Sequence, residues 1–388
     1  PDPPRGRRTR PVEGPARRDG NEQLLDRRRR HVRQREPQHG DGPPDRARHR
    51  PALLRADEEG VPRAAEPVHP RWRRAGAGGG QRERRLPLAG PGAFELRNDG
   101  AVLSSLPGEE FAISTDTMVE GVHFLPNDPP GTIGRKLLRC NLSDLAAMGA
   151  KPHAYTLNVT IPRNGRYSES WFDALSQGLA ADQDQYRIFL LGGDTTSIDG
   201  PLVLSATVYG RLKIGTALHR NSAKPGDGVW VTGTIGDAAL GLQVLQGKLH
   251  DETGFLANRY HLPQPRTDVP LYGLVSTAMD ISDGLIQDCG HIAQESGVSL
   301  HINAANIPLS AAAQQLGESV QALCMSGGDD YELLMTCPPQ NESALVDAFR
   351  LHGIMISRIG EVVPGSQVRV IDAHGHDIIL DKIGWQHC

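Results

Sequence analysis

The amino-acid composition changes near residue 91, and this change limits which part of the chain can form a hydrophobic core. The first ninety residues contain 23 arginines, no lysine and 13 acidic residues, a balance of +10, so that the remainder of this −4 chain carries −14. The first isoleucine is Ile113, the first tyrosine is Tyr155, and Trp72 is the one aromatic residue before position 91. Such a segment buries too little apolar area to offset its chain entropy. We therefore expect a disordered leader over residues 1–90.

Three interpretations of this leader compete. Arginine runs such as Arg27–Arg30 suit a nucleic-acid-binding arm, but such arms usually mix lysine with arginine. A targeting peptide would be poor in acidic residues, which this segment is not. Arginine, proline and glycine without lysine or isoleucine is what GC-rich DNA read in a wrong frame would encode. We favour this third interpretation, and we do not expect nucleic-acid binding.

From residue 91 onwards, strand-like and amphipathic helical segments alternate, as in mixed α/β (α+β) domains. A polar, proline- and glycine-containing segment near 217–227 indicates a boundary between two domains, 91–217 and 218–388. The pattern predicts helices at 132–148, 168–184, 285–294 and 342–351, and another that the segment 234–237 opens and that runs to about residue 245. It predicts strands at 111–114, 153–161, 187–191, 201–212, 228–232 and 330–337, and mostly strands over 354–380.

The cysteine spacing and the hydropathy pattern bear on metal binding, disulfides and membrane insertion. The five cysteines show no C-x-x-C spacing, so zinc and a disulfide framework are not expected. No apolar stretch approaches the roughly 18 residues of a membrane span. We expect a cytoplasmic protein.

Eight aspartates recur in segments rich in glycine, serine and threonine. They are Asp99, Asp116, Asp144, Asp194, Asp280, Asp283, Asp329 and Asp330. Carboxylates are the hard oxygen ligands that Mg²⁺ prefers, and small neighbours leave room for a bulky anion. No phosphate-binding G-x-x-x-x-G-K-[S/T] loop is present, so metal ions would have to hold a nucleotide's phosphates. The pattern predicts a phosphoryl-transfer enzyme with several Mg²⁺ ions.

A single aspartate has a simpler explanation, because aspartate often caps helices and begins turns. Asp283 could cap the helix that follows it, and Asp237 is expected to cap the helix that the segment 234–237 opens. The eight aspartates are informative only as a set.

Six motifs in order resemble the thiamine-monophosphate kinases, a family of the ATP-binding superfamily typified by aminoimidazole ribonucleotide synthetase. They are S-T-D-T-M-V-E-G-V-H-F (114–124), N-L-S-D-L-A-A-M-G-A (141–150), G-G-D-T-T (192–196), A-K-P-G-D (223–227), D-I-S-D-G-L (280–285) and S-G-G-D-D-Y-E-L-L (326–334). The resemblance extends from about residue 91 to the C-terminus.

The resemblance implies ATP-dependent conversion of thiamine monophosphate to thiamine diphosphate. It also implies a homodimer, with a β-barrel formed by the N-terminal halves and a mixed-sheet C-terminal domain. By position, the implied metal ligands are Asp99, Ser114, Thr115, Asp116, Asp144, Asp194, Asp280 and Asp283. The implied ATP contacts are Gly193, Asp194, Arg220 and Ser282, and the implied substrate contacts are His123, Asp329 and Trp385.

A phosphate monoester is already anionic near neutral pH, so its oxygen needs no general base to attack phosphorus. We therefore expect direct in-line transfer, with no phospho-enzyme and no catalytic histidine. Asp283 and Arg220 are the expected catalytic residues, because a guanidinium group can bind phosphate through two N–H groups. The alternatives are an ordinary surface arginine for Arg220, a packing residue for His123, and an aromatic plug for Trp385.

The chain departs from the family in its first motif. Asn98 and Gly100 replace an aspartate and an alanine, and no family-like opening helix precedes them. A catalytically impaired homologue is therefore one alternative. Another is a different enzyme of the superfamily. A carbamoyl dehydratase would use a C-terminal cysteine such as Cys388, and a selenophosphate synthetase would need a reactive cysteine before Cys140.

Overall fold

The computed structural model describes residues 100–372 and 374–385, the isolated residues Gly90, Gly92 and Ala93, and two short strands, β1 (Arg71–Trp72) and β2 (Arg84–Arg85), which pair antiparallel. Most of the predicted leader therefore lies outside the described residues, as do Asn98, Asp99 and Cys388.

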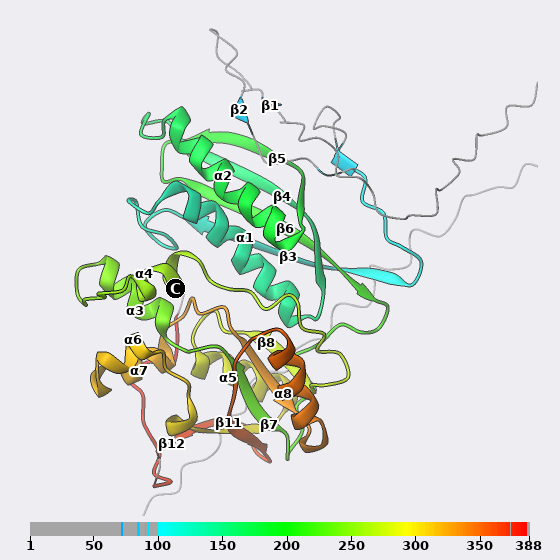
Figure 1. Cartoon of the computed structure of the whole chain (residues 1–388), viewed down its shortest axis with the longest axis vertical. Helices are drawn as coiled ribbons and strands as arrows, with labels where there is room; N and C mark the ends of the chain where they lie inside the picture. Colours follow the sequence, from blue (N-terminus) through cyan, green and yellow to red (C-terminus); the bar gives the residue numbers. More distant parts are fainter. Residues whose placement is uncertain are drawn as a thin grey trace, which may run out of the picture. The chain divides into compact units, whose positions relative to one another are not determined.

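The first half of the described chain is a four-stranded sheet with two helices. Its elements are β3 (Glu109–Val119), α1 (Pro130–Ala147), β4 (Lys151–Pro162), α2 (Glu169–Tyr186), β5 (Phe189–Ile198) and β6 (Val203–Lys213). The strand order is β3-β6-β4-β5, with β4 and β5 parallel and the other pairs antiparallel. Figure 1 shows α1 and α2 together on one face of this sheet.

The two helices cover only one face, and the strands alternate accordingly. Buried residues such as Leu157 and Leu204 point towards the helices and form one core with Leu137 and Leu179. The helices approach closely because Gly178 lies against Gly131, where a side chain would overlap the Gly131 carbonyl oxygen.

The second half is built around a six-stranded sheet of order β12-β9-β11-β7-β10-β8. Its strands are β7 (Gly228–Thr232), β8 (Thr277–Asp280), β9 (Ser299–Asn303), β10 (Leu333–Cys337), β11 (Ile356–Val363) and β12 (Val368–Ile371). Its α-helices are α3 (Asp237–Leu245), α4 (Phe255–His261), α5 (Leu285–Ser296), α6 (Ala311–Gln315), α7 (Gln321–Ser326) and α8 (Glu342–Leu351).

Both faces of this sheet are covered, which explains why β7 and β10 are buried throughout. Val229 and Val231 pack with α5, whereas Trp230 packs with Leu345 and Phe349 of α8. Ala146 and Ala147, at the end of α1, belong to the same cluster as Trp230. Helix α1 therefore joins the cores of the two halves.

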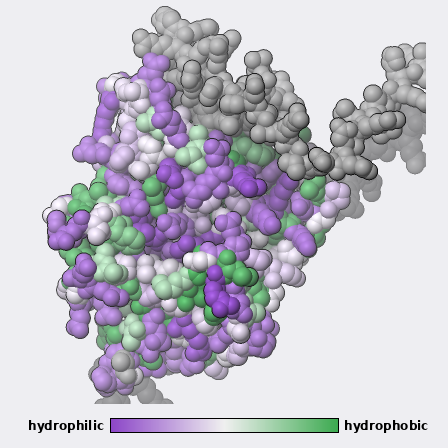
Figure 2. Space-filling view, viewed as in Figure 1, coloured by the Kyte–Doolittle hydropathy of each residue, from purple (hydrophilic) through white to green (hydrophobic). Residues whose placement is uncertain are grey.

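The surface seen in Figure 2 is largely hydrophilic, with smaller apolar patches between the polar residues. None of the described helices is long and apolar enough to cross a membrane.

Candidate functional site

Three of the predicted aspartates come together from three different elements. Asp116 lies within β3, Asp144 near the end of α1, and Asp280 at the last position of β8. Helix α1 contacts both strands, so it brings β3 of the first sheet near β8 of the second. The Ser114 hydroxyl donates a hydrogen bond of 2.6 Å to Asp144 Oδ2. We call Asp116, Asp144 and Asp280 the acidic cluster.

The acidic cluster carries more negative charge than its surroundings balance. Burial, followed by repulsion from Asp144, raises the pKa of Asp116 to about 6. Burial also raises the pKa of Asp280 well above its usual range, and repulsion from Asp144 adds to this; Asp280 is only 3% exposed. Arg220 is near enough to lower the pKa values of Asp144 and Asp280 partially. Carboxylates with too few cationic partners fit a divalent cation that binds oxygen.

The Ser282–Asp283–Gly284 loop lies directly after Asp280. One oxygen of Asp288, Oδ2, accepts hydrogen bonds from the three backbone N–H groups of this loop, at 3.1, 3.2 and 3.1 Å. Asp288 is 1% exposed, and it reaches back from the first turn of α5. Its carboxylate therefore fixes the backbone that carries Ser282 and Asp283.

A second group of possible metal ligands lies at this loop. Asp283, Asp288 and His291 each offer a ligand atom within 4.8 Å of the others. Asp288 and His291 were not among the predicted site residues. Their spacing of three residues within the predicted helix at 285–294 was the available signal, because residues three apart share one helix face.

A buried lysine joins the two halves next to this loop. Lys136 of α1 is 2% exposed and lies 2.7 Å from Asp329, 193 residues further along the chain. Its Nζ atom also donates to the His123 carbonyl oxygen at 3.3 Å and lies 3.6 Å from the centre of the Tyr260 ring. The backbone N–H of Asp329 donates to the Ser282 carbonyl oxygen at 2.9 Å. His123, Asp329 and Ser282 are thus connected through one set of contacts.

The segment containing Trp385 is attached to the same loop. Its backbone N–H donates to the Asp283 carbonyl oxygen at 2.8 Å, and its carbonyl oxygen accepts from Gln287 Nε2 at 2.9 Å. The side chain of Trp385 is 51% exposed.

The structure does not bring every predicted residue to the cluster. Thr115 points to the opposite face of β3 from Asp116, and its hydroxyl donates to the Ala206 carbonyl oxygen at 3.0 Å. Gly193 and Asp194 lie on β5, at the other edge of the sheet from β3. With two strands between, that is roughly 14 Å across the sheet. Asp99 lies outside the described residues.

The side chain of Asp194 lies on the sheet face without helices. In the strand register, Asp194 aligns with Asn158, Ser205 and Thr117, which share one face, whereas Asp116 points to the other. Gly193 has a structural role here, because a side chain at this position would overlap the carbonyl oxygen of Leu157 on the neighbouring strand.

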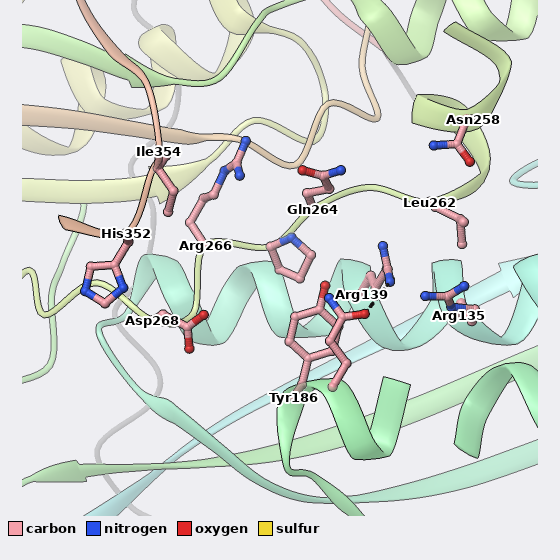
Figure 3. A pocket seen from close by; sticks show the side chains of 12 residues that line it. Arg135, Arg139, Tyr186, Asn258, Leu262, Gln264, Arg266, Asp268, His352 and Ile354 are labelled. Carbon is pink, nitrogen blue, oxygen red and sulfur yellow. Dashed lines mark hydrogen bonds between the residues drawn. The ribbon is translucent and has the colours of Figure 1, made fainter. Parts of the chain in front are cut away.

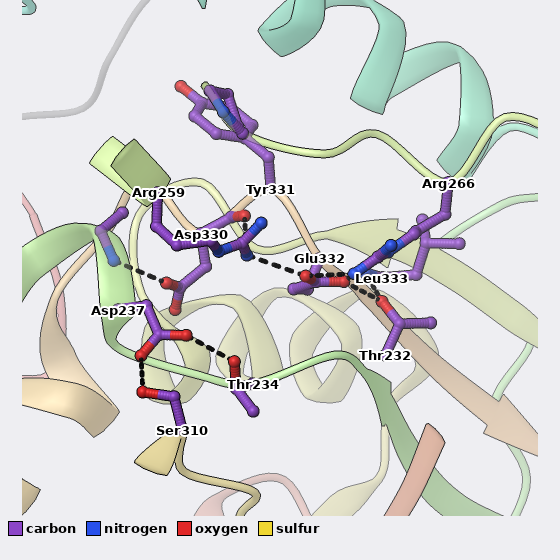
Figure 4. A network of polar contacts seen from close by, with 12 residues as sticks. Thr232, Thr234, Asp237, Arg259, Arg266, Ser310, Asp330, Tyr331, Glu332 and Leu333 are labelled. Atoms are coloured by element: carbon purple, nitrogen blue, oxygen red, sulfur yellow. Dashed lines mark hydrogen bonds and ion pairs between the residues drawn. The ribbon is translucent and has the colours of Figure 1, made fainter. Parts of the chain in front are cut away.

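Asp330 has a structural role, as Figure 4 shows. Its Oδ2 accepts from the Gly236 N–H at 2.7 Å and its Oδ1 from the Ala238 N–H at 3.4 Å, so it binds the start of α3 from a distant loop. The prediction that Asp237 caps this helix is wrong: Gly236 is the N-cap residue, and no side chain there caps the helix. Asp237 instead accepts from Ser310 at 2.5 Å and from Thr234. The capping role considered for Asp283 is also not present, because α5 begins after Gly284 without a side-chain cap.

Comparison with known proteins identifies the class of protein. The chain matches the N-terminal domain of AIR synthase related proteins over residues 97–212 and their C-terminal domain over residues 224–373. The chain belongs to this AIR synthase related family.

The relatives that this chain matches identify a more specific group within the family. It is 40% identical over 312 residues to a thiamine-monophosphate kinase of Caulobacter vibrioides, covering 78% of this chain and 88% of that one. The Escherichia coli K12 thiamine-monophosphate kinase is also 40% identical, over 75% of this chain and 91% of the relative. The resemblance seen in the six sequence motifs is thereby confirmed.

Solved structures of thiamine-monophosphate kinases share the fold of this chain. The thiamine-monophosphate kinase of Stenotrophomonas maltophilia superposes with a TM-score of 0.66 at 39% identity, covering 71% of this chain and 89% of that one. AaThiL complexed with AMPPCP and TMP superposes with a TM-score of 0.64 at 28% identity, covering 75% and 91%. The E. coli hydrogenase maturation protein HypE has a TM-score of 0.64 but 20% identity, so it shares the fold alone.

Proposed function

We propose that this chain catalyses the ATP-dependent phosphorylation of thiamine monophosphate to thiamine diphosphate. The main support for the proposal is the acidic cluster. In it, Asp116, Asp144 and Asp280 come from both halves of the chain and lie beside the Ser282–Asp283 loop. The relatives named thiamine-monophosphate kinase at 40% identity, and the AaThiL complex with AMPPCP and TMP, support this substrate assignment.

The acidic cluster fits Mg²⁺ because it offers several carboxylate oxygens with too little positive charge around them. We assign Asp116, Asp144, Asp280 and Asp283 as its main ligands, with Ser114 orienting Asp144. Asp99 stays in the proposed set. Asp194 would have to bind a separate metal ion on the other face of the sheet, and Thr115 would have to contribute its backbone carbonyl oxygen, since its side chain points away from the cluster. When bound, Mg²⁺ would supply the positive charge that offsets repulsion between ATP and a phosphorylated acceptor.

The chain's own residues position the reactants. Gly193, Asp194, Arg220 and Ser282 are the proposed ATP contacts, and we propose that Arg220 and Asp283 would contact the transferred phosphoryl group. The acceptor phosphate attacks directly in line, because its oxygen is already anionic. A histidine base is not needed, and Nδ1 of His123 already accepts a 3.0 Å hydrogen bond from the Val119 N–H.

For the acceptor, we propose contacts from His123, Asp329 and Trp385. Lys136 positions Asp329, whose backbone has an unusual positive φ of 73°. Trp385 offers a half-exposed indole, and the attachment of its backbone to Asp283 supports a stacking role on an aromatic ring.

The direct test is to mix the purified full chain with ATP, Mg²⁺ and thiamine monophosphate and to detect thiamine diphosphate. We expect product that depends on Mg²⁺ and on thiamine monophosphate. Parallel reactions should offer selenide, the acceptor of a selenophosphate synthetase, and the chain carbamoylated at Cys388, on which a carbamoyl dehydratase would act. ATP turnover with either of these, and none with thiamine monophosphate, would refute the assignment. No turnover with any acceptor would indicate an impaired homologue.

Replacing Asp288 should test the loop geometry. In Asp288→Ala, three backbone N–H groups lose their acceptor, so we expect faster amide exchange at 282–284 and roughly tenfold or greater loss of kcat. Asp288→Asn keeps an acceptor oxygen and should be intermediate. Hydrogen-exchange mass spectrometry with steady-state kinetics measures both effects, and Asp347→Ala, an exposed acid on α8, is the control. Unchanged exchange and turnover in Asp288→Ala would contradict this role.

We also propose that the chain forms a homodimer through the helix-free face and the edges of the four-stranded sheet, closing a β-barrel with the partner's sheet. A single sheet of this chain is open, with β3 and β5 as its edges. Its helix-free face exposes Ile113 by 60% and Ile198 by 44%, which supports a covered surface.

The Ile113→Glu variant should therefore dissociate. Two like charges would be buried near each other in the dimer, so we expect light scattering after size exclusion to give a dimer mass for the unaltered chain and a monomer mass for the variant. Leu351→Glu, on an exposed helix end, should stay dimeric. A monomeric unaltered chain would rule out this dimer without affecting the substrate assignment.

A further inference from the structure

A cavity of about 450 Å³ lies apart from the acidic cluster, and none of the cluster residues lines it. Its walls come from α1, the end of α2, the segment after α4 and the turn between α8 and β11. Figure 3 shows Arg135 and Arg139 on α1 and Tyr186 at the end of α2, with Arg266 on the facing segment. Three guanidinium groups therefore line one small cavity.

One wall has two arginines for a single buried carboxylate. Asp182, which is fully buried, accepts from Arg135 Nε at 2.8 Å and from Arg139 Nη2 at 2.9 Å through the same oxygen, Oδ1. Arg139 Nη2 also donates to Gln185 Oε1, and its other two nitrogens donate to Asp182 Oδ2 and to the Pro263 carbonyl oxygen. Within the described part of the chain, Arg135 makes a hydrogen bond only through Nε. Its two terminal nitrogens remain available.

On the opposite wall Arg266 lines the cavity, and its partner Glu332 also binds Arg259, which does not line the cavity. Glu332 Oε1 accepts from Arg259 Nη2 at 2.8 Å and from Arg266 Nη2 at 2.6 Å, and Glu332 is 1% exposed. The lining adds a single acid, Asp268, which is exposed. The three guanidinium groups of the lining thus contact two buried carboxylates, Asp182 and Glu332, and the excess positive charge lies on the wall where Arg135 and Arg139 share Asp182.

Tyr186 lies close to the charged groups of the cavity wall. Burial raises the pKa of Tyr186 to about 12; Arg139, Arg135 and Arg266 act to lower it, and Asp182 acts to raise it. Its ring also lies 5.5 Å from the Arg139 guanidinium carbon. The cavity therefore combines an arginine fork with an aromatic wall.

We propose that this cavity binds a small doubly charged oxyanion, a phosphate group that is free or carried on a small molecule, through the terminal nitrogens of Arg135. A planar guanidinium edge matches two oxygens of a phosphate, and the wall on which Arg135 and Arg139 share Asp182 supplies excess positive charge for it. The volume exceeds that of one phosphate, so Tyr186 and Ile354 could contact an attached group. This inference goes beyond the proposed function and does not depend on it.

The test uses the full chain with its kinase site filled by a nonhydrolysable ATP analogue, Mg²⁺ and thiamine monophosphate. Inorganic phosphate and phenyl phosphate are titrated separately by calorimetry into the unaltered chain and into Arg135→Gln. We expect saturable binding that weakens at least about tenfold in the variant, because charge-assisted hydrogen bonds are lost. Arg163→Gln, an exposed arginine paired with Asp199, should bind like the unaltered chain.

Each outcome decides the proposal. Binding of both ligands, or of one, with the loss in Arg135→Gln supports it and identifies a free or an ester phosphate as the source. Binding that is equal in Arg135→Gln, or no saturation by either ligand below roughly 10 mM, overturns it. Should Arg135→Gln fail to fold, Arg135→Lys keeps the charge but loses the planar fork. Undiminished affinity in Arg135→Lys would then overturn the proposal.

Discussion

Asp116→Asn is expected to gain stability in the absence of Mg²⁺ and, at the same time, to lose roughly a hundredfold or more in kcat/KM for thiamine diphosphate formation. The gain in stability and the loss of activity have the same cause. The carboxylate is partly buried and is also repelled by Asp144, which opposes folding, but its charge is what the proposed metal ion requires. Urea unfolding in EDTA and steady-state kinetics measure the two effects.

The stability gain should depend on pH. Folded Asp116 has a pKa of about 6, above the usual 3.8, so the folded protein holds this proton more strongly than the unfolded chain does. Its carboxyl group therefore opposes folding increasingly as pH rises from about 4 to 6, and fully above about 6. The free-energy difference between Asp116→Asn and the unaltered chain should grow over this window to roughly 1–3 kcal/mol. A variant that is less stable than the unaltered chain at about pH 8 would contradict the account.

Asp283→Asn and Asp347→Asn complete this experiment. Asp283 is a proposed ligand, so its loss should reduce activity as strongly as the loss of Asp116. Asp347 is an exposed acid paired with Arg350 on α8, and its replacement should change neither activity nor stability measurably. If Asp116→Asn and Asp283→Asn both retain full turnover, the metal-ligand assignment fails.

The second large effect is expected at Asp182, where we predict a loss of about 3–5 kcal/mol in the free energy of unfolding for Asp182→Ala. Asp182 is fully buried, and its two oxygens bind Arg135 and Arg139 at 2.7–2.9 Å. Removing it leaves Arg139, only 5% exposed, without its carboxylate. Arg139 also holds the Pro263 carbonyl oxygen, so the segment after α4 should loosen with it.

Urea unfolding measures this loss, and Asp199→Ala serves as the matched control. Asp199 forms an exposed ion pair with Arg163 at 3.3 Å, which should contribute at most about 1 kcal/mol. A loss below about 1 kcal/mol for Asp182→Ala would mean that the two arginines find other partners or water.

Much of the secondary structure follows from local patterns. The strand predicted at 228–232 and the helix at 342–351 match β7 and α8 because apolar residues there end at clear turn signals. The predicted strand ends at 114 and 191 are wrong, because β3 continues to Val119 and β5 to Ile198. In both strands the polar residues that suggested an end instead occupy an exposed face or edge. The strand predicted at 330–337 begins only at Leu333, since Asp329 and Tyr331 have positive φ.

The site was only partly predictable from the sequence, because residues that lie far apart in the chain come together in it. The aspartates of the acidic cluster follow from their recurrence, and the six motifs predicted the family. Lys136 could not be predicted, because its partner Asp329 is 193 residues away and reaches it only in the folded chain. The opposite orientations of Thr115 and Asp116 also depend on which face of the sheet the helices cover. The domain boundaries and the cytoplasmic location stay predictions.

A crystal structure of the full chain with Mg²⁺, thiamine monophosphate and a nonhydrolysable ATP analogue would test the central claim most directly. The account predicts Mg²⁺ about 2.0–2.1 Å from oxygens of Asp116, Asp144, Asp280 or Asp283, with the polyphosphate bound to the same ions. A polyphosphate that lies away from these carboxylates, with no ion between them, would contradict it.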